Sequence, residues 1–378
     1  MRAYVLRDAR LAKHAGRFVW LSIDTENARN VDFLARYPVE TWPTFLVLSP
    51  HDGKPVLKWL GSATAAQLDE ILTSAGRRAA APRVRRADAV LASADRSYAE
   101  GRVEDGIAGY REALKLGGPR WSGRPRAVES LVLAEAAAGQ LEECATTARQ
   151  DGPRLPRGNG FAAVAATGLS CANAAAPDAS WRGQALAALE PLAGAAMRIP
   201  DLLADDRAGL YQALVEARAA RGDEAGARGL AERWWSFLEQ ERGRAATPEA
   251  RASLDSWRVG AAIALGDPAR ALPALEQSER DLPRDYNPPA RRAYLLRELG
   301  RLSEARSAVE RALEKAYGPR KLKVYQLAAS ILEKQGDRAA LAATLSEALA
   351  YANGLPASQR DENVASALSA KLTAVQGE

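Results

Sequence analysis

The sequence is poor in the residues that carry most metal and nucleophilic chemistry. Its 378 residues include only two cysteines, Cys144 and Cys171, and two histidines, His14 and His51. Two thiols cannot build a disulfide framework or a thiolate-rich metal site, and two histidines are too few for an ordinary zinc site. No phosphate-binding glycine loop, Gly-x-Ser-x-Gly or His-Glu-x-x-His motif occurs either. We therefore predict no metal, no cofactor and no catalytic residue.

Long apolar runs are also missing. No stretch of about 18 apolar residues occurs, and the first thirty residues lack the segments of an export signal. The sequence as written predicts a cytoplasmic protein without membrane contact. The alternative is an exported protein whose true N-terminus lies upstream of Met1. With 47% hydrophobic residues, the chain has enough material for two or three folded domains.

Excess positive charge is confined to one short segment. The net charge is +5, and residues 74–88 alone hold five arginines against one aspartate. The arginines are Arg77, Arg78, Arg83, Arg85 and Arg86. Such a cluster can contact phosphates, but no aromatic residues are interleaved with it. We interpret residues 76–88 as a solvated basic linker between two domains and do not predict nucleic-acid binding.

Helix and strand patterns alternate before this linker. We expect strands at 18–24 and 44–49, a hairpin turn at Asp52-Gly53, and a second hairpin strand that Gly61 ends. Pro43 marks the entrance of the middle strand, since proline cannot donate to a β-ladder. Helices are expected at 4–16, at 27–37 and at 64–76, the last with Ser62 or Thr64 as its cap. The predicted order is α-β-α-β-β-α.

This order, with a proline before the second strand, resembles the thioredoxin superfamily. The motifs are "LSID", "YPVETWPTFLVL", "DGK" and Gly61 followed by "TAAQLDEIL". The resemblance implies that the Trp42-Pro43 peptide is cis and that the backbone before it binds an extended client. It therefore makes Trp42, Pro43 and Thr44 the candidate client-binding loop. It also implies an incomplete α/β domain over residues 1–75, because the first strand and the Cys-x-x-Cys of the family are missing.

The missing strand leaves two explanations open. In the family it lies between the strands that match 18–23 and 44–49, so we expect those two strands to lie apart, with an unfilled slot between them. The preferred explanation is a natural start upstream, with a dithiol there. The alternative is a degenerate domain that serves only as a docking surface.

Alanine-rich helices with a recurring small residue follow the linker. Six glycines each end an apolar helical stretch: Gly101, Gly139, Gly222, Gly266, Gly300 and Gly336. The residues five places after them are, in the same order, Gly106, Cys144, Ala227, Ala271, Ala305 and Leu341. This pattern resembles the tetratricopeptide repeat, a helix-turn-helix unit of about 34 residues. We expect an all-α repeat solenoid over residues 89–378, with one further helical hairpin near 160–195.

The repeat pattern also assigns roles to the cysteines and aromatics. Cys144 falls on a small inward position, so we expect both cysteines to be structural rather than a disulfide or a redox sensor. Trp234 is expected in the core, whereas Trp235 on the neighbouring face is a candidate for a ligand groove. Tyr98 and Tyr110 are expected to pack within the first repeat.

Two functions remain open from sequence alone. One is a protein that binds protein or peptide clients and performs thiol-disulfide or chaperone-type work, with its dithiol upstream. The other is a redox-silent interaction scaffold without enzymatic activity. Stacked helix pairs build extended concave surfaces for peptides, so both functions predict protein partners.

Overall fold

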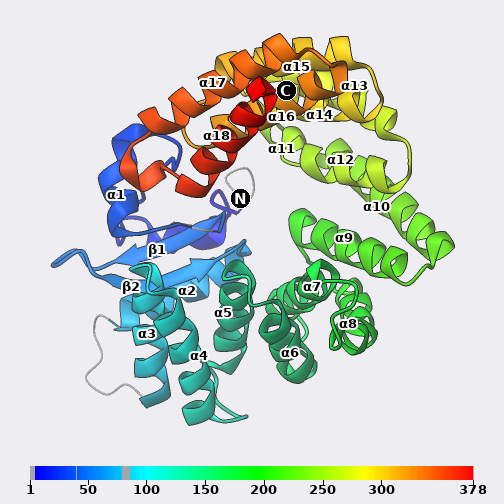
Figure 1. Cartoon of the computed structure of the whole chain (residues 1–378). Coiled ribbons are helices and arrows are strands. Elements are labelled where there is room, and N and C mark those ends of the chain that lie inside the picture. The colour runs from blue at the N-terminus through cyan, green and yellow to red at the C-terminus, as the bar shows by residue number, and fades with distance from the viewer. Residues whose placement is uncertain (1–4, 40, 79–85, 378) are drawn as a thin grey trace. The chain divides into compact units, whose positions relative to one another are not determined.

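The computed structural model of the chain (Figure 1) describes residues 5–39, 41–78 and 86–377. The chain divides into two compact units. The first unit comprises Met1–Trp20 and Tyr37–Trp234, and the second comprises Leu21–Arg36 and Trp235–Glu378. The predicted boundaries near residues 75 and 89 stay a prediction, but the hairpin falls in the same unit as the first helices of the array.

The N-terminal segment has less regular structure than expected. It contains the 3₁₀ helices η1 (Ala9–His14) and η2 (Ala28–Asn30) and the short helix α1 (Val31–Arg36). The predicted strand at 18–24 is wrong, because these residues form no strand, and Val19 is 87% exposed. A strand gains its stability from a ladder partner, and a β-prone run without one stays irregular. The unfilled slot expected between strands at 18–23 and 44–49 is therefore not formed, because the first of these strands does not form.

The β-hairpin forms as the sequence predicts. β1 (Thr44–Leu48) pairs antiparallel with β2 (Pro55–Leu60), and the Trp42-Pro43 peptide is cis. Gly53 in the turn and Gly61 after β2 both have positive φ, which glycine adopts without a steric penalty. α2 (Ala65–Arg78) follows, and its cap is Thr64, whose hydroxyl accepts from Gln67 N at 3.2 Å while the Gln67 side chain accepts from Thr64 N.

Beyond this point the described chain is helical, as predicted. Residues 79–85 of the expected basic linker lie outside the described residues. The main helices follow two by two: α3 (Arg86–Ala99) and α4 (Val103–Gly117), α5 (Arg124–Ala137) and α6 (Leu141–Asp151), α7 (Asn159–Ala174) and α8 (Arg182–Ala196), α9 (Ala204–Ala220) and α10 (Glu224–Arg244), α12 (Asp255–Ala264) and α13 (Leu272–Asp281), α14 (Asn287–Glu298) and α15 (Leu302–Lys315), α16 (Arg320–Gln335) and α17 (Arg338–Gly354).

Shorter elements complete the array. They are η3 (Gly152–Arg154), α11 (Pro248–Ala252), η4 (Pro268–Ala271) and η5 (Ala357–Gln359), and the last helix is α18 (Glu362–Gly377). The expected hairpin near 160–195 is confirmed as α7 and α8, which pack on each other. We call α3, α5, α7, α9, α12, α14, α16 and α18 the first helices, since each opens a helix pair or, for α18, ends the array. Neighbouring first helices pack together from α5 to α7 to α9, and from α12 to α14 to α16.

The recurring glycines allow the two helices of a pair to turn sharply and pack closely. All six recurring glycines have positive φ, between 71° and 80°, directly after a first helix. The positions five residues later are buried. At Gly106 a Cβ would lie 2.8 Å from the Tyr98 Cβ, so the close contact of α3 and α4 requires glycine. Tyr98 and Tyr110 are both 1% exposed, which confirms that they pack within the first repeat.

Candidate functional site

The predicted client loop lies at the entrance of β1. The Pro43 carbonyl accepts from Gly61 N at 2.9 Å, and the Thr44 hydroxyl donates to the Thr41 carbonyl at 2.6 Å. Both contacts fix the loop to the end of the hairpin. The Trp42 side chain is 51% exposed there. The structure thus presents Trp42 at the surface beside Pro43 and Thr44, and contact of this loop with a client stays a prediction.

Trp235, the other predicted contact, lies on α10 in the second unit and is 8% exposed. Its ring is flanked by two guanidinium groups, Arg270 at 4.7 Å and Arg258 at 5.6 Å from the ring centre. These are cation–π distances. Trp234 is 1% exposed, which confirms its predicted place in the core. A role for Trp235 in a ligand groove stays a prediction.

In the first unit, the first helices hold the hairpin. β2 packs on α3 and α5 (Figure 1). Lys58 of β2 is buried, and its ammonium donates to the carbonyls of Pro38 (2.9 Å) and Tyr98 (3.3 Å) while lying 4.7 Å from the centre of the Tyr98 ring. A buried ammonium needs such acceptors, because desolvation without them would be costly. Lys58 therefore ties β2 to the end of α3.

A second charged side chain, which is half-buried, strengthens this contact. Arg126 of α5 donates to Asp95 of α3 at 2.7 Å and to the Lys58 carbonyl at 3.4 Å. The Tyr110 hydroxyl donates to the other Asp95 oxygen at 3.1 Å. Burial raises the pKa of Tyr110 well above its usual value, so the hydroxyl keeps the proton that it donates. Four elements, β2, α3, α4 and α5, thus meet at Asp95.

The loop after β2 reaches farther along the first helices. The Ser62 hydroxyl donates to Asp206, near the start of α9, at 2.6 Å. Burial raises the pKa of Asp206 to about 6, against the opposing effect of the Ser62 hydrogen bond. Burial raises the pKa of Glu129 on α5 to about 8, and the nearby Asp206 carboxyl adds to the shift. Two carboxyl groups with raised pKa values therefore lie where the loop meets α5 and α9.

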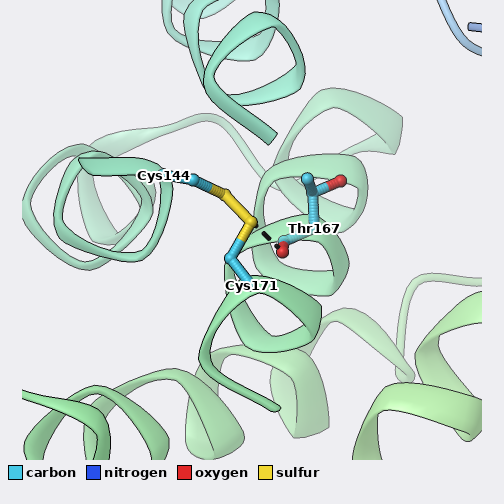
Figure 2. The surroundings of a disulfide bond; sticks show 3 residues. All are labelled: Cys144, Thr167 and Cys171. Atoms are coloured by element: carbon cyan, nitrogen blue, oxygen red, sulfur yellow. Dashed lines mark hydrogen bonds between the residues drawn. A yellow bond between two sulfur atoms is a disulfide. The ribbon is translucent and has the colours of Figure 1, made fainter. Parts of the chain in front are cut away.

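The cysteines are bonded to each other, which corrects the expectation of two separate structural thiols (Figure 2). Cys144 of α6 and Cys171 of α7 form a disulfide, with their Cα atoms 6.3 Å apart. The Cys144 sulfur lies 3.8 Å from the Thr167 carbonyl oxygen, a packing contact because a disulfide sulfur carries no hydrogen to donate. Cys144 occupies the buried position that the repeat pattern predicts. The prediction missed that Cys171, on the next helix α7, lies close enough to Cys144 to bond to it.

The described residues provide few other candidates for chemistry. Across 5–39, 41–78 and 86–377, no three His, Cys, Asp or Glu side chains are grouped to hold a metal ion. No described helix is long and apolar enough to cross a bilayer. Sequence reasoning missed the acidic pair Glu129 and Asp206, since these residues come together only because α5 and α9 both pack on α7.

Comparison with known proteins finds likeness in fold only. No family model matches the sequence, and a search of curated proteins finds no significant match. Among solved structures, a tetratricopeptide repeat protein from Parabacteroides merdae is 11% identical with a TM-score of 0.49, over 76% of this chain and 98% of that one. A TPR protein of Thermus thermophilus is 19% identical with a TM-score of 0.34, over 65% and 98%.

A third similar structure is the TPR2AB domain of yeast Sti1 in its pHSP90 complex. It is 16% identical with a TM-score of 0.30, over 77% of this chain and 98% of that one. The assignment of this chain to the class of helical-repeat proteins rests on its own helix pairs and glycine turns. The last three units are of the tetratricopeptide type in helix order and spacing, because Gly266, Gly300 and Gly336 follow one another at 34 and 36 residues, whereas the earlier glycines are 38, 83 and 44 residues apart.

Proposed function

We propose that this chain is a binding scaffold that holds a protein or peptide client on the first helices of its repeats. The supporting observation is that the first helices of the first unit already hold a polypeptide, namely the chain's own hairpin, through Lys58, Arg126 and Ser62. Stacked helix pairs create an extended surface of this kind. In the second unit, we place the client on α12, α14, α16 and α18.

The thioredoxin-like part enters this proposal as a docking module without redox activity. The hairpin and α2 have the predicted order, but the strand expected at 18–24 is not formed. Thiol-disulfide exchange needs a thiolate that reaches its substrate. Residues 1–378 contain only Cys144 and Cys171, which are buried and bonded to each other. For residues 1–378 taken by themselves, we therefore favour the redox-silent scaffold.

The disulfide bears on where the protein works. Disulfides persist in oxidising compartments and are rare in the cytosol. We therefore propose export or another oxidising location in place of the cytoplasm. The test is alkylation in denaturant of the protein taken directly from the cells that make it, since both cysteines are buried in the folded chain. We expect no alkylated cysteine before reduction and two after reduction, whereas two alkylated cysteines before reduction would contradict the proposal.

Selection from a display library tests the binding function. Random 12-residue peptides are selected on the immobilised full chain, and insulin reduction is measured on the same preparation. We expect enriched peptides that bind the soluble protein and no insulin reduction above the uncatalysed rate. The matched control is the chain after thermal unfolding. The absence of any peptide specific for the folded chain would contradict the proposal.

A further inference from the structure

A short acidic turn near the N-terminus belongs to the second unit and is bound to C-terminal residues of the same unit. We call residues 24–27 the docked turn. The Tyr317 hydroxyl donates to an Asp24 carboxylate oxygen at 2.9 Å, and the Gln359 amide donates to the Thr25 carbonyl at 3.0 Å. The Asp24 hydrogen bond raises the pKa of Tyr317, as expected for a phenol that donates to a carboxylate. Tyr317 thus binds the side chain of Asp24, and Gln359 binds the backbone of Thr25.

The third residue makes the strongest contact. Arg320 N, at the start of the 16-residue helix α16, donates to the Glu26 carboxylate at 2.8 Å, and the Arg320 side chain forms an ion pair with it at 3.3 Å. The Glu26 side chain is only 13% exposed. A helix N-terminus favours a carboxylate through its unpaired N–H groups and its dipole, and the guanidinium adds a full positive charge. Glu26 is therefore held by two independent donors.

A glycine makes room for the turn. Gly318 has φ +61°, and a Cβ there would lie 2.7 Å from the Cβ and 2.8 Å from the Cα of Glu26. Any side chain at 318 would meet the backbone of the docked turn. Gly318 thus leaves space for the backbone of another polypeptide, and Arg320 supplies the positive charge that binds its carboxylate.

The turn is largely preformed within its own segment. Glu26 N donates to the second Asp24 carboxylate oxygen at 2.9 Å, and the Asn30 amide donates to the Asp24 carbonyl at 2.8 Å. An isolated peptide with the same residues can form these bonds. The contacts of the turn with Tyr317, Arg320 and Gln359 are polar and partly solvated, with Tyr317 49% exposed, so exchange with water or with another ligand costs little.

We propose that Tyr317, Gly318, Arg320 and Gln359 form a binding site for an acidic Asp-x-Glu turn, and that residues 24–27 occupy it as a tethered competitor. The partner is a peptide or protein loop that presents two carboxylates two residues apart. Binding of such a loop displaces the docked turn. This inference rests on the proposed function, because it specifies which chemical groups the proposed client presents and where on the repeats it binds.

The experiment measures binding of the chain's own turn as a separate molecule. A fluorescein-labelled peptide of residues 21–30, LSIDTENARN, is titrated with full-length protein at low salt. The tether keeps the internal turn at an effective concentration of about 1 mM, so the wild type binds the peptide weakly. In the variant D24N/E26Q the internal competitor is weakened. We expect affinity for the peptide to rise at least about tenfold.

Two further variants separate the site from general effects. Adding Arg320→Gln to D24N/E26Q removes the guanidinium, and adding Gly318→Ala fills the space that the peptide backbone needs. We expect either addition to lower the affinity at least about tenfold. The peptide LSINTQNARN, in which amides replace both carboxylates, should bind none of the proteins measurably. Circular dichroism and thermal melts check that each variant is folded. Hydrogen exchange should be faster at residues 21–30 in D24N/E26Q.

Equal binding by the wild type and D24N/E26Q, or equal binding of the acidic peptide and the peptide without carboxylates, would overturn the inference. Either result leaves the binding function open, because the display selection is performed on random peptides and on the whole surface. If that selection also fails, the binding function fails with it. If the selection fails but the acidic peptide binds as described, the site exists without a general client role.

Discussion

Glu129 and Asp206 are protonated more readily in the folded chain than in the unfolded one. Their pKa values are raised from 4.5 to about 8 and from 3.8 to about 6. The folded state therefore binds these protons more tightly, so the groups favour folding below about pH 4 and lose that effect as pH rises to 8. Arg126 opposes the Glu129 shift, and Asp205 adds to that of Asp206.

Glu129→Gln should remove most of this dependence. We expect the variant to be more stable than the wild type at pH 8, by roughly 1 to 3 kcal/mol, with the difference shrinking toward pH 4.5. Urea unfolding at several pH values measures it. Glu142→Gln, at an exposed position of α6, is the matched control and should leave the pH profile unchanged. A difference that grows as pH falls would contradict the account.

The disulfide should stabilise the first unit. It closes a loop of 27 residues between α6 and α7, and a loop of this length is expected to contribute about 2 to 4 kcal/mol. The variant C144A/C171A should unfold at correspondingly lower urea concentration. Reduced wild type, kept in excess thiol, should unfold close to the variant. Unchanged unfolding on reduction would show that the bond does not constrain the chain.

At the scale of the elements, one buried carboxylate supports the contact of the hairpin with α3 and α5. Asp95 is fully buried and accepts from Arg126 and Tyr110. Asp95→Ala leaves the Arg126 charge without its partner, so we expect a loss of roughly 3 to 5 kcal/mol in the free energy of unfolding. Hydrogen exchange should also become faster in β2, whose Lys58 carbonyl shares Arg126.

Asp105→Ala is the matched control for this prediction. Asp105 forms an exposed ion pair with Arg102 on α4, 3.2 Å apart, and exposed pairs add little to stability. A similar loss of unfolding free energy in both variants would mean that the Asp95 contacts stabilise the chain no more than an exposed ion pair does. Faster exchange throughout the first unit, rather than first in β2, would mean that the cluster does not act on the hairpin.

Local elements were predictable because their signals are local. The turn at Asp52-Gly53, the end of β2 at Gly61 and the Thr64 cap of α2 each depend on a few neighbouring residues, and all three are confirmed. The run at 18–24 has the same β-prone composition as β1, yet forms no strand. The difference is that β1 has β2 beside it, whereas strand formation at 18–24 depends on a partner outside the run.

At the scale of the whole molecule, the repeat class was predictable and the contacts were not. The glycine pattern identifies six helix pairs, and the 83-residue gap between Gly139 and Gly222 leaves room for one more, which the structure shows as α7 and α8. The bond between Cys144 and Cys171 depends on how α6 packs on α7, which the spacing alone does not reveal. The contact of Glu26 with Arg320 spans 294 residues and has no sequence signature. Trp42, Pro43 and Thr44 were predicted as a site by resemblance alone.

Site-specific photo-crosslinking tests the central claim, that the first helices of the second unit hold the client. Benzoylphenylalanine replaces either Lys323, exposed on α16, or Glu314, exposed on the second helix α15. Each protein is irradiated with a peptide obtained by display selection. We expect crosslinks from position 323 that unlabelled peptide suppresses, and few from position 314. Equal crosslinking from both positions, or crosslinking from 314 alone, would contradict the account.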